Sequence, residues 1–188
     1  MLKYIILFIA FTTICFGQNQ KCELLFNDGT TIEGYGSLTN KDKIKFRLDR
    51  NSKPDTWDHT NVKRITFFGF ENLKVTYQYV KMMFSTKRKL LEVVVDGEVK
   101  LLADVKSEWM SLGKPWNNTK IDATELFLIK HNEKELTPVN LGLFGNWKKK
   151  LLRYFEDCPE VTDGIKSGEY NRNNIKTLVE DYNIYCTE

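Results

Sequence analysis

The cysteines are the residues of this chain with the most readily recognised chemistry. Cys15 lies in an apolar N-terminal stretch, which leaves Cys22, Cys158 and Cys186 in the remainder. An exported protein can form disulfides, but an odd number leaves one cysteine unpaired. The apolar, strand-like surroundings of Cys22 predict an inert buried thiol, and a nucleophilic cysteine is the alternative.

Cys158 and Cys186 both fall on the apolar stripes of predicted helices. In a simple two-helix hairpin they would lie roughly 20 Å apart at ~1.5 Å per residue, whereas a bridge needs Cα atoms within about 7 Å. A disulfide therefore requires residues 160–166 to form a short returning helix, which Pro159 at a first helical position permits. The sequence is compatible with this disulfide and equally with two buried free thiols.

The two histidines lack the spacing of a metal or catalytic motif. His59 follows Asp55 and Asp58 in DTWDH, which could begin a metal site or an acid–base pair, but no HExxH or HxH accompanies it. We predict that His59 lies in an exposed polar loop and His131 in a solvated turn. G-x-S-x-G, G-x-G-x-x-G, P-loop, EF-hand and C-x-x-C motifs do not occur either. The sequence thus predicts no catalytic residue, no metal ligand and no cofactor.

Two tryptophans form the candidate binding surface. Trp109 and Trp116 lie in residues 106–119 (KSEWMSLGKPWNNT), a segment without regular periodicity that we predict to be a loop. On an exposed loop their rings could stack on a sugar or bind a peptide or protein partner. The alternative is that both side chains fold inward and fill an open end of a sheet.

The elements that must position these residues are mainly strands up to about residue 140. Residues 90–105 (LLEVVVDGEVKLLADV) predict a β-hairpin around Asp96-Gly97, since these residues tolerate the positive φ of a two-residue turn. In that register Val94 would face Val99.

Residues 21–48 show the same pattern, with a turn at 27–29 and strands on both sides. Further strands are expected at 62–68, 73–83, 123–130 and 133–139. Within residues 43–48 the side chains alternate strictly, which predicts a strand with an apolar face (Ile44, Phe46, Leu48) and a basic face (Lys43, Lys45, Arg47). A small barrel or a curled antiparallel sheet would accommodate these strands.

From residue 144 the apolar period becomes helical. Asn146 can cap a helix whose apolar positions are spaced by four (Trp147, Leu151, Phe155), and a second stripe follows within 171–185 (Ile175, Leu178, Val179, Tyr182). We therefore expect an α+β protein. An antiparallel twisted sheet or barrel-like meander occupies residues 18–142, and a C-terminal helical cap at 143–188 packs on it.

Residues 1–17 predict a signal peptide, with Lys3 before an apolar run and small residues ahead of Gln18. The run is shorter than the ~20 residues that cross a bilayer, so we expect cleavage, no membrane span in the mature chain, and export to the periplasm or the cell exterior. A formal charge of +3 over 188 residues is too small to indicate binding to nucleic acid or to an anionic membrane.

Three sequence patterns carry a family resemblance: the leader ending in CFGQ, YFEDCPEV at 154–161 and LVEDYNIYC at 178–186. On these patterns the chain resembles exported β-rich proteins of Bacteroidetes-type bacteria. The resemblance covers the leader and roughly the last third of the chain, and the β-region only in general style. It implies export, and it implies no known activity, cofactor or catalytic residue.

Three hypotheses about function follow. The first is a non-enzymatic envelope or secreted module that binds an envelope protein or a surface glycan through Trp109 and Trp116. The second is a hydrolase acting on envelope polymer or nutrient, with carboxylates that the sequence does not identify. The third is a structural part of an envelope assembly. A deep polar cleft with converging acids would favour the hydrolase, and a flat or apolar patch at the tryptophans would favour binding.

Overall fold

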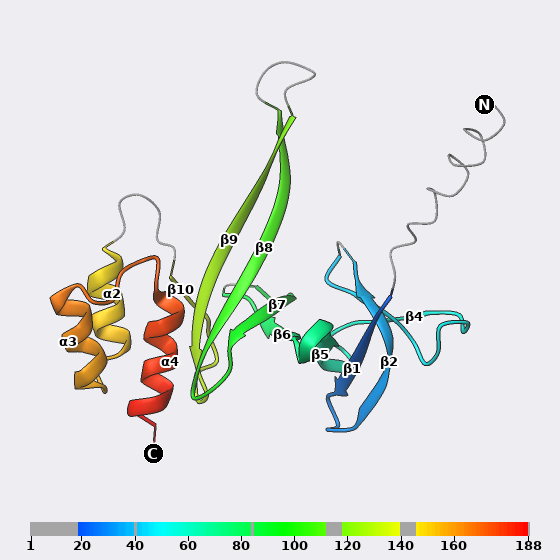
Figure 1. Cartoon of the computed structure of the whole chain (residues 1–188), viewed down its shortest axis with the longest axis horizontal. Helices are drawn as coiled ribbons and strands as arrows, with labels where there is room; N and C mark the ends of the chain where they lie inside the picture. Colours follow the sequence, from blue (N-terminus) through cyan, green and yellow to red (C-terminus); the bar gives the residue numbers. More distant parts are fainter. Residues whose placement is uncertain (1–18, 40, 84, 112–117, 140–145, 188) are drawn as a thin grey trace.

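The computed structural model describes residues 19–39, 41–83, 85–111, 118–139 and 146–187, with the backbone alone at 105–111 and 118–123. Ten strands in these ranges form one antiparallel sheet, in the order β10-β9-β8-β7-β6-β5-β1-β2-β3-β4, and three α-helices follow (Figure 1). The strands are β1 (Gln20–Phe26), β2 (Thr31–Leu38), β3 (Ile44–Arg47), β4 (Asp55–Trp57), β5 (Val62–Phe68), β6 (Lys74–Lys81), β7 (Arg88–Val95), β8 (Val99–Ser111), β9 (Asn118–Lys130) and β10 (Thr137–Pro138). A short 3-10 helix, η1 (Phe70–Asn72), follows β5, and the helices are α2 (Trp147–Tyr154), α3 (Pro159–Ser167) and α4 (Ile175–Tyr185).

The predicted α+β class is confirmed. The sheet is a meander in which β5 returns to pair with β1, and it is open, so the barrel-like closure does not occur. The predicted signal peptide lies outside the described residues. Within the described ranges, no helix has both the length and the apolar character needed to cross a membrane.

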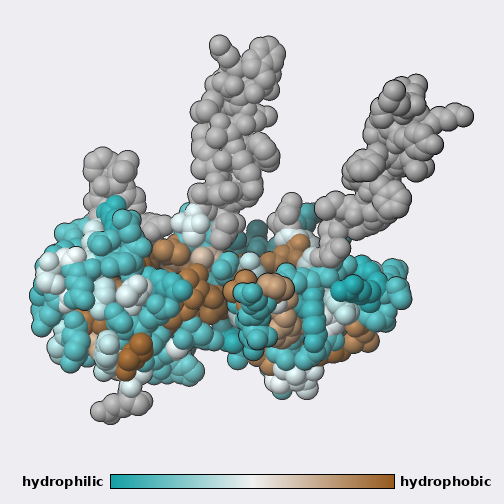
Figure 2. Space-filling model, viewed as in Figure 1, coloured by the Kyte–Doolittle hydropathy of each residue, from teal (hydrophilic) through white to brown (hydrophobic). Residues whose placement is uncertain are grey.

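Three clusters of buried apolar side chains hold the fold together. One lies between the helices and one face of β7–β9, and includes Leu101, Leu128, Phe155 and Leu178. A second lies on the opposite face of the same strands. A third fills the β1–β5 end of the sheet with the help of β6 and β7. Figure 2 shows apolar surface gathered between the helices and the strands, whereas the outer surface of the helices is mainly hydrophilic.

The hairpin between β7 and β8 forms, but its predicted register is wrong. Val93 pairs with Leu102 and Val95 with Leu101, and the strand is irregular between Val93 and Val95. The loop is therefore longer than two residues, and among the described glycines only Gly29 and Gly168 have a positive φ.

Contacts from distant parts of the chain explain this register. Asp96 forms an ion pair with Arg64 on β5 at 3.3 Å and another with Lys100. Asn183 on α4 accepts a hydrogen bond from Val99 N at 2.9 Å and donates one to Val99 O at 2.8 Å. These contacts hold Asp96 and Val99 from outside the hairpin, and local turn chemistry does not include them.

The β1–β2 hairpin is confirmed. Gly29 adopts φ +88°, the left-handed conformation that glycine reaches without steric cost, and it closes the turn. Gly36 on β2 pairs with Gln20 on β1, and a Cβ at position 36 would come within 2.8 Å of the Cys22 sulfur. The buried Cys22 side chain therefore requires glycine at position 36.

Three sequence predictions need correction. Strand β3 ends at Arg47, so Leu48 is 62% exposed and does not share the buried face of Ile44 and Phe46. Residues 106–111 and 118–119 are strand and not loop. Strand β10 is confined to Thr137–Pro138, so a six-residue connection follows Lys130.

The helical predictions are confirmed. The Asn146 side chain accepts a hydrogen bond from Lys149 N at 3.0 Å and caps α2. Helix α3 is the returning helix that a disulfide requires, with Pro159 as its first residue. Cys158 and Cys186 are joined in a disulfide, with Cα atoms 5.7 Å apart, which decides between the two alternatives left open by the sequence.

Candidate functional site

The β8–β9 ribbon is the most prominent projection of the molecule. Pairing between β7 and β8 ends at Ala103, and the last hydrogen bond on the other side joins Val139 N to Leu126 O. Backbone pairing then continues through the eight pairs from Asp104↔Glu125 to Ser111↔Asn118 between β8 and β9, and the buried Asp104 side chain still forms an ion pair with Lys89 on β7. Eight pairs are separated by seven residue steps of about 3.3 Å each, so the two-stranded arm is roughly 23 Å long. Figure 1 shows this arm rising from the sheet.

The ribbon carries one of the two predicted site residues. Trp109 lies in β8 with its Cα opposite that of Lys120 in β9, near the outer end of the arm. Its side chain, and the whole of Trp116, lie outside the described residues. The strand assignment places Trp109 on a paired backbone, which fixes its position along the arm more firmly than a loop would.

A second surface feature lies at the far end of the sheet. A hollow of about 470 Å³ on the outer face of β2, β3 and β4 is lined by Ser37, Leu38, Thr39, Lys41, Lys43, Lys45 and Thr56, and we name it the lysine hollow. Lys45 is flanked across the strands by Ser37 on β2 and Thr56 on β4. An ammonium group is thereby set between two hydroxyl groups on neighbouring strands.

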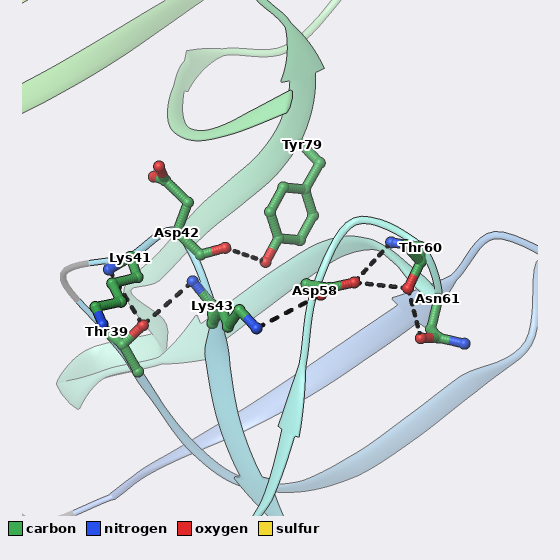
Figure 3. A network of polar contacts seen from close by, with 8 residues as sticks. All are labelled: Thr39, Lys41, Asp42, Lys43, Asp58, Thr60, Asn61 and Tyr79. Atoms are coloured by element: carbon green, nitrogen blue, oxygen red, sulfur yellow. Dashed lines mark hydrogen bonds and ion pairs between the residues drawn. The ribbon is translucent and has the colours of Figure 1, made fainter. Parts of the chain in front are cut away.

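The rim of the lysine hollow is held by polar contacts (Figure 3). The Thr39 hydroxyl accepts hydrogen bonds from the backbone N of Lys41 at 3.4 Å and of Lys43 at 3.2 Å. Asp42 adopts φ 51°, which is uncommon for a non-glycine residue. Its carbonyl accepts a 2.6 Å hydrogen bond from the buried Tyr79 hydroxyl. Burial raises the pKa of Tyr79 well above its ordinary value, so this donor keeps its proton.

One carboxylate approaches the lysine hollow from outside. Asp58 lies 3.9 Å from the Lys43 ammonium. Its pKa is lowered mainly by hydrogen bonds from the Thr60 hydroxyl at 2.6 Å and from Thr60 N at 3.0 Å. Asp58 therefore caps its own turn, and its ion pair with Lys43 is long.

A polar groove of about 470 Å³ lies beside α2 and has Lys130, Glu133, Tyr154 and Asp157 among its lining residues. The Lys130 ammonium pairs with Asp157 at 2.7 Å and lies 5.4 Å from the ring centres of both Tyr154 and Tyr182. Tyr182 also donates to Asp157 at 2.8 Å, and Tyr154 donates to Glu133 at 2.8 Å. This network ties β9 to α2 and α4.

Protonation in this groove is set by the same contacts. Partial burial by itself would raise the pKa of Asp157, but hydrogen bonds from Lys130 and Tyr182 outweigh it and lower that pKa. Burial likewise opposes protonation of Lys130, and Asp157 more than compensates, so the pKa of Lys130 is raised. Both groups are held in their charged forms, which suits a structural ion pair better than proton transfer.

The histidines and cysteines show no catalytic arrangement. The partly buried ring of His59 packs against Tyr79 with 6.1 Å between ring centres, and His131 is an exposed turn residue. Cys22 is fully buried, and burial raises the pKa of its thiol to about 12, so little thiolate forms near neutral pH. In the described ranges the only cluster with potential metal ligands is Cys158, Glu160 and Cys186, whose two sulfurs are bonded to each other.

The sequence indicated only part of the lysine hollow. The alternation of Lys43, Lys45 and Arg47 was a visible signal of a basic strand face. Ser37 and Thr56 join this face through strand pairing, and the register of that pairing cannot be read from either strand alone.

Comparisons of the chain with protein-family models, with curated proteins and with solved structures find no match. The resemblance to exported β-rich proteins of Bacteroidetes-type bacteria therefore stays a prediction.

Proposed function

We propose that this protein is an exported, non-enzymatic binding module that contacts a partner protein of the cell envelope or surroundings through the β8–β9 ribbon. The observation that carries the proposal is the eight-pair extension of β8 and β9 beyond their last neighbouring strands. An isolated two-stranded ribbon is marginally stable in water, so a long one adds little to the fold. Backbone N–H and C=O groups along the edges of such a ribbon can pair with an extended segment of a partner.

Export is supported by two independent features. The N-terminal residues have the pattern of a signal peptide. The Cys158–Cys186 disulfide is of a kind that persists in oxidising compartments and is uncommon in the reducing cytosol. Both features agree with an envelope or secreted location.

The hydrolase hypothesis gains no comparable support from the described residues. The polar groove beside α2 contains acids, but Asp157 is paired with Lys130 and Glu133 accepts hydrogen bonds from Tyr154 and from Lys130 N. A glycosidase would need two carboxylates available across a cleft.

The proposal can be tested by shortening the ribbon. In one variant, residues 106–123 are replaced by Asn-Gly, so that Val105 and Thr124, which pair in the intact ribbon, flank a two-residue turn. A photo-cross-linking amino acid is placed at position 109 in the full-length protein and, as a control, at the exposed position 63 on β5. Both proteins are incubated with envelope extract of the source organism and irradiated.

We expect a discrete adduct from position 109, none from position 63, and competition by the intact protein but not by the shortened one. Thermal unfolding of the shortened variant should stay within a few degrees of the wild type, since residues 106–123 lie beyond the last pair between β8 and β7. Identical adducts from both positions would contradict the proposal, as would a shortened variant that competes fully. A Trp109→Ala, Trp116→Ala variant then separates contact through the tryptophans from contact through the strand edges.

A further inference from the structure

We propose that the lysine hollow binds a linear anionic polysaccharide, with its carboxylate or sulfate groups held by Lys43 and Lys45. This site lies at the opposite end of the sheet from the ribbon, and it does not depend on the function proposed above. Three features of the lysine hollow support this proposal: its positive charge, its hydroxyl groups and the fixed shape of its rim.

Positive charge dominates the surface of the lysine hollow. Among the described residues that line it, three are lysines and none is acidic. Lys41 and Lys45 are exposed, and no carboxylate within the described ranges forms an ion pair with either. Lys43 has only the 3.9 Å pair with Asp58. A ligand that brings negative charge would therefore meet ammonium groups that are free to pair with it.

The cations form a line and not a single point. Lys43 and Lys45 alternate with the buried Ile44 on β3, so their Cα atoms are about 6.7 Å apart on the same face. Arg47 continues this strand and donates a hydrogen bond to Arg50 O at 3.0 Å, and the Arg50 guanidinium lies 5.0 Å from the centre of the Tyr35 ring. A polymer with charges repeated along its length matches such a line better than an isolated anion does.

The polar groups around Lys45 suit a hydroxylated ligand. Ser37 and Thr56 flank Lys45 on the two neighbouring strands, and each offers a hydroxyl that can donate or accept. Sugar hydroxyls need both kinds of partner, and a carboxylate or sulfate can accept from the ammonium between them. Leu38, 38% exposed, supplies an apolar surface for the face of a sugar ring.

Nucleic acid fits this surface less well. Proteins that bind single strands combine cations with aromatic rings on which the bases stack, and no aromatic side chain is among the residues described as lining the hollow. The rim is also fixed before any ligand arrives, because Tyr79 holds Asp42 and the Thr39 side chain holds the backbone of 41 and 43 (Figure 3). A preformed rim lowers the conformational cost of binding.

The test uses the whole mature chain and fluorescently labelled oligosaccharides. Fluorescence anisotropy is measured at 50 mM NaCl with an oligogalacturonate, which carries carboxylates, and with a heparin oligosaccharide of similar length, which carries sulfates. A neutral dextran oligosaccharide and a single-stranded DNA oligonucleotide serve as comparison probes. Binding of either anionic sugar supports the proposal, and their relative affinities identify which group is preferred.

The variants separate a site from general attraction. Lys43→Gln combined with Lys45→Gln should weaken anionic-sugar binding about tenfold, since each exposed charge contributes modestly. The control, Lys63→Gln combined with Lys149→Gln, changes the net charge equally at exposed positions elsewhere and should leave binding within about twofold. Lys45→Arg should retain binding. All four side chains are outside the apolar clusters, so thermal unfolding should report the same fold throughout.

Several results would overturn the proposal. One is an equal loss of anionic-sugar affinity in the two double variants. Others are no binding of either anionic sugar at low salt, and tighter binding of the DNA probe or of dextran than of the anionic sugars. Backbone amide shifts in ¹⁵N–¹H spectra provide an independent readout. Shifts on titration should concentrate at Ser37, at residues 43–45 and at Thr56, and shifts confined to other regions would refute the assignment. Failure here would leave the ribbon proposal untouched, because the two tests share no variant and no probe.

Discussion

Asn183 offers the sharpest test of how the helices are attached to the sheet. Its side chain on α4 accepts from Val99 N at 2.9 Å and donates to Val99 O at 2.8 Å, across 84 residues of sequence. Val99 is fully buried, so these backbone groups have little access to water. Asn183→Ala removes both partners at once.

The expected loss of stability follows from those two hydrogen bonds. Each contributes about 1 kcal/mol net, and a buried group left without a partner costs about 1–3 kcal/mol, so we expect Asn183→Ala to cost about 2–3 kcal/mol. For a domain of this size that corresponds to a fall in Tm of about 4–12 °C. Urea unfolding with the disulfide kept oxidised measures the change. Thr177→Ala, at an exposed position of the same helix, is the matched control and should stay within about 0.5 kcal/mol of wild type.

Asn183→Asp adds a dependence on pH that packing alone would not produce. A protonated carboxyl can donate to Val99 O and accept from Val99 N as the amide does, whereas a carboxylate can only accept. The folded state therefore favours the protonated form and raises the pKa of the new side chain above the unfolded value of about 3.9. The stabilising contribution is fully present below that value and is lost as pH rises through the raised folded pKa.

The stability gap between Asn183→Asp and wild type should consequently narrow as pH falls from 7 toward 4. A gap that is constant with pH would refute the hydrogen-bond interpretation. So would an Asn183→Ala variant as stable as Thr177→Ala.

Three further predictions concern other parts of the fold. Gly36→Ala should destabilise by about 1–3 kcal/mol in urea unfolding, because its Cβ would lie 2.8 Å from the Cys22 sulfur, while Gly29→Asn at the exposed turn should cost less. Reducing the disulfide, which joins cysteines 28 residues apart in the sequence, should cost about 3–4 kcal/mol of stability. The cost is measured as the difference in the free energy of unfolding between oxidised and reduced protein. Lys130→Met should cost about 1–2 kcal/mol near neutral pH through lost ion-pair and cation–π contacts. The pKa of Asp157 is lowered in the folded state, so the ion-pair share of that cost should disappear as pH falls below about 4.

The sequence predicted elements well where one face of an element is buried. Ile44 and Phe46 alternate with lysines and form β3, and the stripe of Ile175, Leu178 and Tyr182 forms α4. In both cases apolar residues recur at the period of the structure, because that face packs into a core.

The same logic explains the failure at residues 106–119. Beyond Ala103, β8 pairs with β9 and no longer with β7, and a two-stranded arm of this kind does not require the alternation of apolar and polar residues that a sheet packed on a core requires. Its strands are specified by pairing with each other, as in Trp109 opposite Lys120, and such pairing leaves no period to detect in a single strand. The absence of periodicity is therefore compatible with a two-stranded ribbon and does not by itself indicate a loop.

The β7–β8 register and the Cys158–Cys186 disulfide differed in how far they could be predicted from the sequence. From the sequence, formation of the disulfide depended on one condition, a returning helix after Cys158, because helix rise and Cα separation are fixed quantities. The β7–β8 register could not be predicted in this way, because Asn183 and Arg64 contact the hairpin from 84 and 32 residues away along the chain. Turn chemistry at Asp96-Gly97 was a sound local rule that tertiary contacts overrode.

The placement of the two proposed surfaces makes their tests interpretable. The outer ribbon begins beyond Ala103, where β8 stops pairing with β7, and the lysine hollow lies on the outer face of strands whose other face is buried. Neither Lys43 nor Lys45 belongs to an apolar cluster. Substitutions at these positions should consequently change binding while leaving the free energy of unfolding almost unchanged. A variant that lost both together would show that the surface is part of the core, and it would refute the assignment of that surface to binding.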